Sequence, residues 1–132
     1  MAFRSFEDLR VYNLAEQLAD EIWNIVIAWD YFERNTVGQQ WVDAADSIGA
    51  NIAEGAGRGT PNDNKRFIRI SRGSYNETKY WYQRAVMRQL INEEQKIKLK
   101  QLMDELGPTL NAYLKSIGKG CTPNTKHQLC PK

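Results

Sequence analysis

Apolar residues recur at helical spacing in four separate stretches of this 132-residue chain. This periodicity limits the possible folds more than any other feature, because a repeat of three to four residues places apolar side chains on one face of an α-helix. The stretches cover residues 6–29, 37–55, 61–90 and 93–117. Four amphipathic helices with short connections predict an all-α fold, an antiparallel up-down four-helix bundle. We expect residues 1–117 to form this domain and residues 118–132 to form a flexible C-terminal tail.

The clearest break between two helices is the glycine-rich stretch at residues 55–61. Thr60 is a favourable N-cap residue, Pro61 suits the first helical position, and Asp63 completes a pattern similar to a capping box. The sequence therefore predicts that the third helix starts at Pro61.

The last helix has a start signal and an internal breaker. Asn92 and Gln95 have the spacing of a capping box. Gly107 and Pro108 lie within the helix, and proline lacks a backbone donor and clashes with the preceding turn. We expect this pair to kink or interrupt the helix.

The formal net charge of +2 conceals a segregation of charge along the chain. Residues 1–55 have three basic and ten acidic side chains, a balance of −7, whereas residues 56–100 have eleven basic and four acidic ones, a balance of +7. The small net charge argues against a bulk polycation, but the asymmetry is typical of an interaction surface. It equally allows acidic and basic helices to pair within one assembly, so both interpretations stay open.

The basic side chains of the third helix lie opposite its apolar side, at about 100° per residue. A stripe of Lys and Arg with Asn76 and Tyr80 between them is typical of a surface that binds phosphate backbones and contacts bases. Two alternatives stay open for this basic stripe. It is a face that only contacts solvent, or it pairs with the acidic first helix of a neighbouring copy. The predicted nucleic-acid-binding residues are Arg58, Lys65, Arg66, Arg69, Arg72, Lys79 and Arg84.

Three small hydroxyl residues, Ser71, Ser74 and Thr78, lie in the middle of the apolar side of this third helix. Small residues let a neighbouring helix approach closely. Their hydroxyl groups can also bond back to the carbonyls of the preceding turn.

The apolar sides of the first two helices are wider than burial within one bundle requires. Trp23, Trp29, Trp41 and Trp81 add further apolar area, and exposing much of it is unusual for a monomer. We therefore expect self-association. The alternative is a monomer in which some tryptophans lie flat over the ends of the bundle.

No pattern for catalysis or metal binding stands out. The single histidine, His127, lies in the tail with Cys121 and Cys130, and their spacing does not match a zinc site. We expect no enzyme, no cofactor and no metal. No apolar run is long enough to span a bilayer and the N-terminus lacks the apolar core of a secretory signal, so we expect a cytoplasmic protein with no membrane partner.

Residues 47–58, SIGANIAEGAGR, resemble the signature SI-x-x-NIAEG-x-GR of the 23S rRNA intervening-sequence protein family, also called four helix bundle proteins. The opening FEDLRVY at residues 6–12, Arg66-Phe67 after the glycine-rich turn, and Gly73-Ser74 with Glu77 agree with this family. The resemblance covers residues 3–117 and implies a cytoplasmic bacterial four-helix bundle that assembles as a homopentamer.

The resemblance extends to a related group, the accessory (Avd) proteins of diversity-generating retroelements. These proteins form basic pentameric barrels that bind the element's reverse transcriptase and nucleic acid. The sequence and the resemblance together favour a non-enzymatic oligomer that binds the backbone of RNA or DNA and serves as an accessory to a reverse transcriptase. The alternative is a protein–protein adaptor or scaffold without direct nucleic-acid contact.

The signature residues allow a structural and a functional interpretation. In the first, Glu54 and Arg58 pair at i, i+4 and Asn51 satisfies backbone groups exposed by the break, which makes a rigid corner. In the second, the backbone N–H groups of the glycines at residues 55–59 form an anion site at the start of the third helix. The signature residues are Asn51, Glu54, Gly55, Gly57, Ser74 and Glu77.

Overall fold

A computed structural model describes residues 5–119 of the chain, and within this range it contains helices and no strand. The all-α bundle predicted from the apolar periodicity is confirmed. The predicted tail at residues 118–132, with Cys121, His127 and Cys130, lies outside the described residues except for Gly118 and Lys119. The long helices are α1 (Arg10–Val26), α3 (Gln39–Ala56), α4 (Pro61–Met87) and α5 (Glu93–Ser116). The short elements are the 3-10 turn η1 (Phe6–Asp8), α2 (Tyr31–Glu33) and the π-helical turn η2 (Arg34–Gly38).

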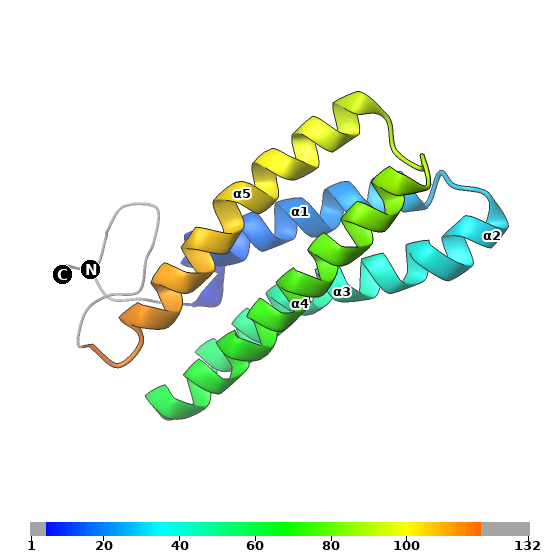
Figure 1. Cartoon of the computed structure of the whole chain (residues 1–132). Coiled ribbons are helices and arrows are strands. Elements are labelled where there is room, and N and C mark those ends of the chain that lie inside the picture. The colour runs from blue at the N-terminus through cyan, green and yellow to red at the C-terminus, as the bar shows by residue number, and fades with distance from the viewer. Residues whose placement is uncertain (1–4, 120–132) are drawn as a thin grey trace.

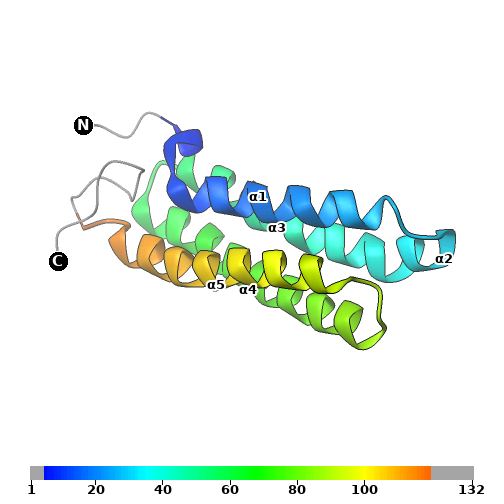
Figure 2. The ribbon, with the colours of Figure 1, turned by 90° about the horizontal axis from the view of Figure 1, so that it is seen from above.

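Successive long helices run in opposite directions, as both views of the ribbon show (Figures 1 and 2). Helix α3 packs between α1 and α4, and α5 packs between the same two helices on the other side. Helices α1 and α4 therefore lie on a diagonal of the bundle, and their outer surfaces face different directions.

The core consists of the apolar stripes of the long helices. Leu18, Ile48, Ile68 and Leu106, one from each long helix, are 0% exposed, and so is Trp41 of α3. Full burial of one such aliphatic side chain contributes about 1.5–3 kcal/mol. The spacing seen in the sequence is thus the spacing of the residues that hold the bundle together.

The most extensive helix contact is between α3 and α4. The hydroxyl of Ser71 donates to the carbonyl of Ile48 across this contact at 2.8 Å, and the indole N–H of Trp41 donates to the carbonyl of Thr78 at 3.1 Å. The expected bond back to the preceding turn is confirmed for Thr78, whose hydroxyl donates to the carbonyl of Ser74 at 2.8 Å. For Ser71 the expected bond to its own preceding turn is wrong, because α3 lies close enough for its carbonyl to accept the hydrogen bond instead.

The segment at residues 30–36 was expected to connect two helices, but residues 31–36 are themselves helical and run directly into α3. It contains no glycine or proline that would break a helix. The amide of Asn35 donates to the carbonyl of Tyr31 at 2.8 Å, and the hydroxyl of Thr36 donates to the carbonyl of Phe32 at 2.7 Å. These side-chain bonds satisfy carbonyls where the wider π-helical turn disturbs the regular backbone ladder.

Both predicted helix starts are confirmed. The hydroxyl of Thr60 accepts from the backbone N–H of Asp63 at 3.2 Å at the start of α4. At the start of α5, Asn92 and Gln95 form a capping box with reciprocal bonds of 2.7 and 2.9 Å. Each cap satisfies backbone donors that the first turn of a helix leaves unpaired.

Of the two outcomes expected at Pro108, a kink or an interruption, the interruption is wrong, because α5 continues through this residue as one helix. The neighbouring Gly107 packs against Tyr75 of α4, and a Cβ atom at this position would lie 2.7 Å from the Tyr75 hydroxyl oxygen. That hydroxyl donates to the carbonyl of Met103 at 2.6 Å. The ring of Tyr75 therefore supports α5 in the turn where proline weakens its backbone ladder.

No helix within residues 5–119 combines the length and the apolar character needed to cross a membrane.

The contact between Gly107 and Tyr75 gives a test of the fold. We expect Gly107→Ala to lower the free energy of unfolding by about 1–2 kcal/mol, because the strain of overpacking exceeds the gain in helix propensity. The matched control is Gly73→Ala on α4, where an added Cβ has no neighbour within 4 Å. It should raise the free energy of unfolding by about 1 kcal/mol, the intrinsic helical preference of alanine. Urea denaturation measures both, and equal effects of the two changes would contradict the packing argument.

Candidate nucleic-acid interface

Five of the predicted binding residues lie on α4 without a neutralising partner. Arg69, Arg72 and Lys79 are exposed, and Lys65 and Arg84 are half-buried. No ion pair joins any of the five to another residue within 5–119. We call these five residues the basic face. The sequence correctly placed them away from the buried side of α4.

Contacts with uncharged groups hold part of the basic face beside α5. The guanidinium of Arg72 donates to the side-chain oxygen of Asn111 at 3.4 Å. The ammonium of Lys79 lies 5.7 Å from the centre of the Tyr75 ring. Neither contact neutralises the cation, so the edge of α4 nearest α5 keeps its positive charge.

Arg58 and Arg66 differ from the basic face, because carboxylates neutralise them. The guanidinium of Arg58 pairs with Glu54 at 2.8 Å, and that of Arg66 pairs with Asp63 at 3.2 Å. Both guanidinium groups also lie over the ring of Phe67, at 4.6 and 4.4 Å from its centre. The predicted i, i+4 pair of Glu54 and Arg58 is confirmed. These two arginines brace the junction of α3 and α4, residues 54–67, which we call the corner.

Gly55 permits the close approach of α3 and α4 at the corner. A Cβ atom on Gly55 would lie 2.5 Å from the side-chain oxygen of Asn64 and 3.0 Å from Cβ of Phe67. No larger residue fits without a shift of one helix. The glycine of the signature is therefore a packing requirement.

The structure bears on two sequence-based expectations for the corner, and the one for Asn51 is wrong. The amide of Asn51 donates to the carbonyl of Ser47 at 2.8 Å, one turn back within α3, and does not reach the break. The backbone N–H groups of Gly57 and Arg58 donate to the carbonyls of Glu54 and Gly55, at 3.2 and 3.1 Å. Two donors near the expected anion site are thus already used, and the carboxylates of Glu54 and Asp63 lie beside it.

The last two signature residues, Ser74 and Glu77, lie on α4 away from the corner. Ser74 is half-buried and its carbonyl accepts from Thr78. The carboxylate of Glu77 accepts from the indole N–H of Trp81 at 3.2 Å. Glu77 thereby orients an aromatic side chain near the C-terminal end of α4.

The acidic residues of α1 and α3 gather on another side of the bundle. A shallow groove of about 220 Å³ between these helices is lined by small residues and by Glu16, Asp20 and Asp46. Burial, followed by the charges of Asp43 and Asp20, raises the pKa of Asp46 above its usual value. Because α1 and α4 lie on a diagonal, these acidic side chains do not neutralise the basic face of the same chain.

Arg88 was not among the binding residues predicted from the sequence. Arg72, Asn76, Tyr80, Arg84 and Arg88 follow one another at i+4 steps, so they form a single ridge along α4. This spacing was the signal that could have found Arg88. The ridge connects the basic face with the end of the bundle where α4 stops.

Within residues 5–119, no group of three or more His, Cys, Asp and Glu side chains is arranged to hold a metal ion.

Residues 7–112 match the family described as 23S rRNA-intervening sequence protein. The chain belongs to this family. A crystal structure of a protein of unknown function from the S23 ribosomal protein family of Bacteroides thetaiotaomicron VPI-5482 shares its fold, with a TM-score of 0.71. The two sequences are 24% identical, and the likeness covers 80% of this chain and 98% of the other. No curated protein matches the chain.

The different surroundings of Arg58 and Arg69 give a second test. We expect Arg58→Ala to lower the free energy of unfolding by about 1 kcal/mol, because it removes a partly exposed i, i+4 ion pair and a cation–π contact. Arg69→Ala should change it by less than about 0.5 kcal/mol, as at most surface positions without specific contacts. Chemical denaturation of the two variants measures the difference. A larger loss at Arg69 than at Arg58 would overturn the division between corner and basic face.

Proposed function

We propose that this protein is a non-enzymatic oligomer that binds the backbone of RNA or DNA through the basic face of α4. The observation that supports this most directly is the set of five cations without an ion-pair partner among the described residues. Charged side chains of one sign on one helix attract the phosphates of a nucleic acid and release its condensed counterions. Binding of this kind is sensitive to salt and only weakly specific for sequence.

The charge distribution favours binding of nucleic acid at one surface of the protein over general coating of nucleic acid by the protein. The net charge of the chain is only +2, because the acidic side chains of α1 and α3 offset the cations of α4. A nucleic acid is therefore attracted to one side of the bundle and repelled from another. The charge pattern orients the strand along α4.

Self-assembly is part of the proposal, as a homopentamer. Large apolar side chains on several helices support it: Trp23 and Ile27 are each 52% exposed, Ile70 44% and Ile97 53%. Trp23 and Ile27 lie one helical turn apart at the end of α1, and exposed apolar area of this kind favours association. An oligomer would also present several basic faces to one strand, which strengthens binding through effective concentration. In this proposal the assembly serves as an accessory to a reverse transcriptase by holding its nucleic acid.

The double variant Arg69→Glu/Arg72→Glu tests the binding surface. We expect it to abolish binding of a single-stranded RNA or DNA in a filter-binding assay. Binding by the wild-type protein should weaken by about 10²-fold or more between 50 and 200 mM salt, if several phosphates are neutralised. Arg34→Glu/Lys98→Glu is the matched control, because it changes the net charge equally at exposed positions outside α4.

The control variant should keep most of the affinity. Equal affinity of the wild-type protein and the α4 variant would overturn the proposal. A partner that stays bound in native lysate after nuclease treatment, with no affinity of the pure protein for nucleic acid, would favour an adaptor instead.

The proposal requires the basic face to remain accessible in the assembly. We expect sizing with light scattering to give about five times the chain mass of 15.2 kDa, and the same mass at 0.1 and 1 M salt. High salt screens charges beyond about 3 Å but does not weaken apolar contacts. Dissociation at 1 M salt would show that the basic face pairs with the acidic side of a neighbouring copy, and would contradict the proposed binding surface.

A further inference from the structure

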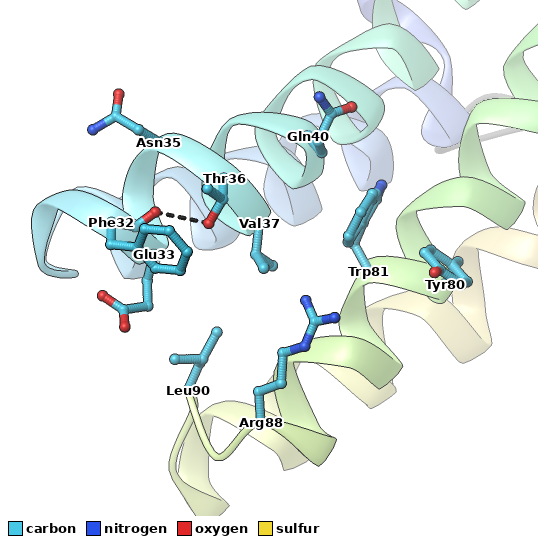
Figure 3. A pocket seen from close by; sticks show the side chains of 10 residues that line it. All are labelled: Phe32, Glu33, Asn35, Thr36, Val37, Gln40, Tyr80, Trp81, Arg88 and Leu90. Atoms are coloured by element: carbon cyan, nitrogen blue, oxygen red, sulfur yellow. Dashed lines mark hydrogen bonds between the residues drawn. The ribbon is translucent and has the colours of Figure 1, made fainter.

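A cleft of about 610 Å³ opens at the end of the bundle where α4 stops (Figure 3). One wall comes from α2, η2 and the start of α3, with Phe32, Glu33 and Gln40. The other comes from the last turns of α4, with Tyr80, Trp81 and Arg88. The cleft thus joins the segment that the sequence predicted as a link with the most aromatic part of the chain.

The ridge of α4 leads from the basic face into this cleft. Tyr80 and Arg88 belong both to the ridge and to the lining of the cleft, and Arg84 lies between them at the same i+4 spacing. A strand whose phosphates lie along the ridge would therefore pass the mouth of the cleft.

The indole ring of Trp81 forms part of the wall of the cleft, and neighbouring side chains hold it in one orientation. The indole N–H of Trp81 donates to the carboxylate of Glu77 at 3.2 Å, and the ring of Tyr80 meets Trp81 edge-on, with 4.9 Å between the ring centres. Tyr80 is 52% exposed and Phe32 on the opposite wall is 71% exposed. Exposed aromatic rings beside cations are the usual platforms for nucleobases, because every base has a face that can stack.

Polar groups in the cleft suit the edge of a base. The guanidinium of Arg88 points toward the interior of the cleft, and Gln40 also lines it (Figure 3). An arginine side chain donates hydrogen bonds to the edges of bases. A side-chain amide can both donate hydrogen bonds to these edges and accept them. The hydroxyl of Thr36 is already bonded to the carbonyl of Phe32, so it is a fixed part of the wall.

We propose that this cleft receives an unpaired base of a nucleic acid strand that is bound along α4, with the base stacked on Trp81. The proposal rests on the proposed function and sharpens it, because a base in a duplex is already stacked and cannot enter. The protein would then prefer single-stranded to double-stranded nucleic acid, although its phosphate contacts are the same for both.

A pair of oligonucleotides separates base contacts from phosphate contacts. The probes are a fluorescently labelled 15-nucleotide strand of deoxythymidine and an abasic strand of the same length, measured by anisotropy at low salt. We expect the wild-type protein to bind the strand with bases more tightly. Trp81→Ala should lower the affinity for that strand about tenfold, the usual effect of losing one stacking platform, and leave the affinity for the abasic strand unchanged.

Two further variants keep the test decisive. Phe32→Ala changes a side chain that is 71% exposed, so it preserves the fold if Trp81→Ala does not, and it should also weaken binding of the base-containing strand alone. Tyr31→Ala removes the neighbouring aromatic side chain, which is 75% exposed and does not line the cleft, and should have no effect. If the wild-type protein binds both strands equally and the cleft variants change nothing, the cleft proposal fails while the proposed function stands. If neither strand binds, the proposed function fails, and the cleft proposal fails with it.

Discussion

The placement of charge on this protein depends on the close contact between α3 and α4. The hydroxyl of Ser71 bonds to a carbonyl of α3, and the indole of Trp41 bonds to a carbonyl of α4. Both bonds are buried, and breaking either would leave a polar group without a partner at a cost of about 1–3 kcal/mol. They fix the rotation of α4 about its axis. Because the period of an α-helix is fixed, the same rotation turns Arg69, Arg72 and Lys79 away from α3.

The up-down order of the helices then determines how the charges are separated. Helices α1 and α4 run in the same direction and lie on a diagonal, with α3 and α5 between them. The acidic side chains of α1 cannot reach the cations of α4 in the same chain. A single ion pair between α1 and α5, formed by Arg10 and Glu105, joins two neighbouring helices and leaves this separation intact. The net charge is near zero because the acidic side chains of α1 and the cations of α4, which lie on different sides of the bundle, offset each other.

Apolar periodicity and cap spacing predicted the helices, the caps at Thr60 and Asn92, and the outward placement of the basic face. These features depend on residues within a few turns of one another. The continuity of α5 through Pro108 depends on Tyr75 from another helix, and no local pattern shows that contact. The cleft also escaped prediction, because Phe32 and Trp81 lie far apart in sequence and residues 30–36 were expected to form a link. Tertiary proximity, which one sequence does not display, accounts for both failures.

Arg58 and Arg66 at the corner differ from the cations farther along α4. At the corner, Glu54 and Asp63 neutralise Arg58 and Arg66, and both guanidinium groups lie over the ring of Phe67. Beyond Phe67, the cations Arg69, Arg72, Lys79 and Arg84 have no ion-pair partner among the described residues. The family signature at residues 47–58 coincides with the neutralised end, so it specifies how α3 turns into α4. On α4 beyond that signature, a change of side chain alters the surface without disturbing the corner.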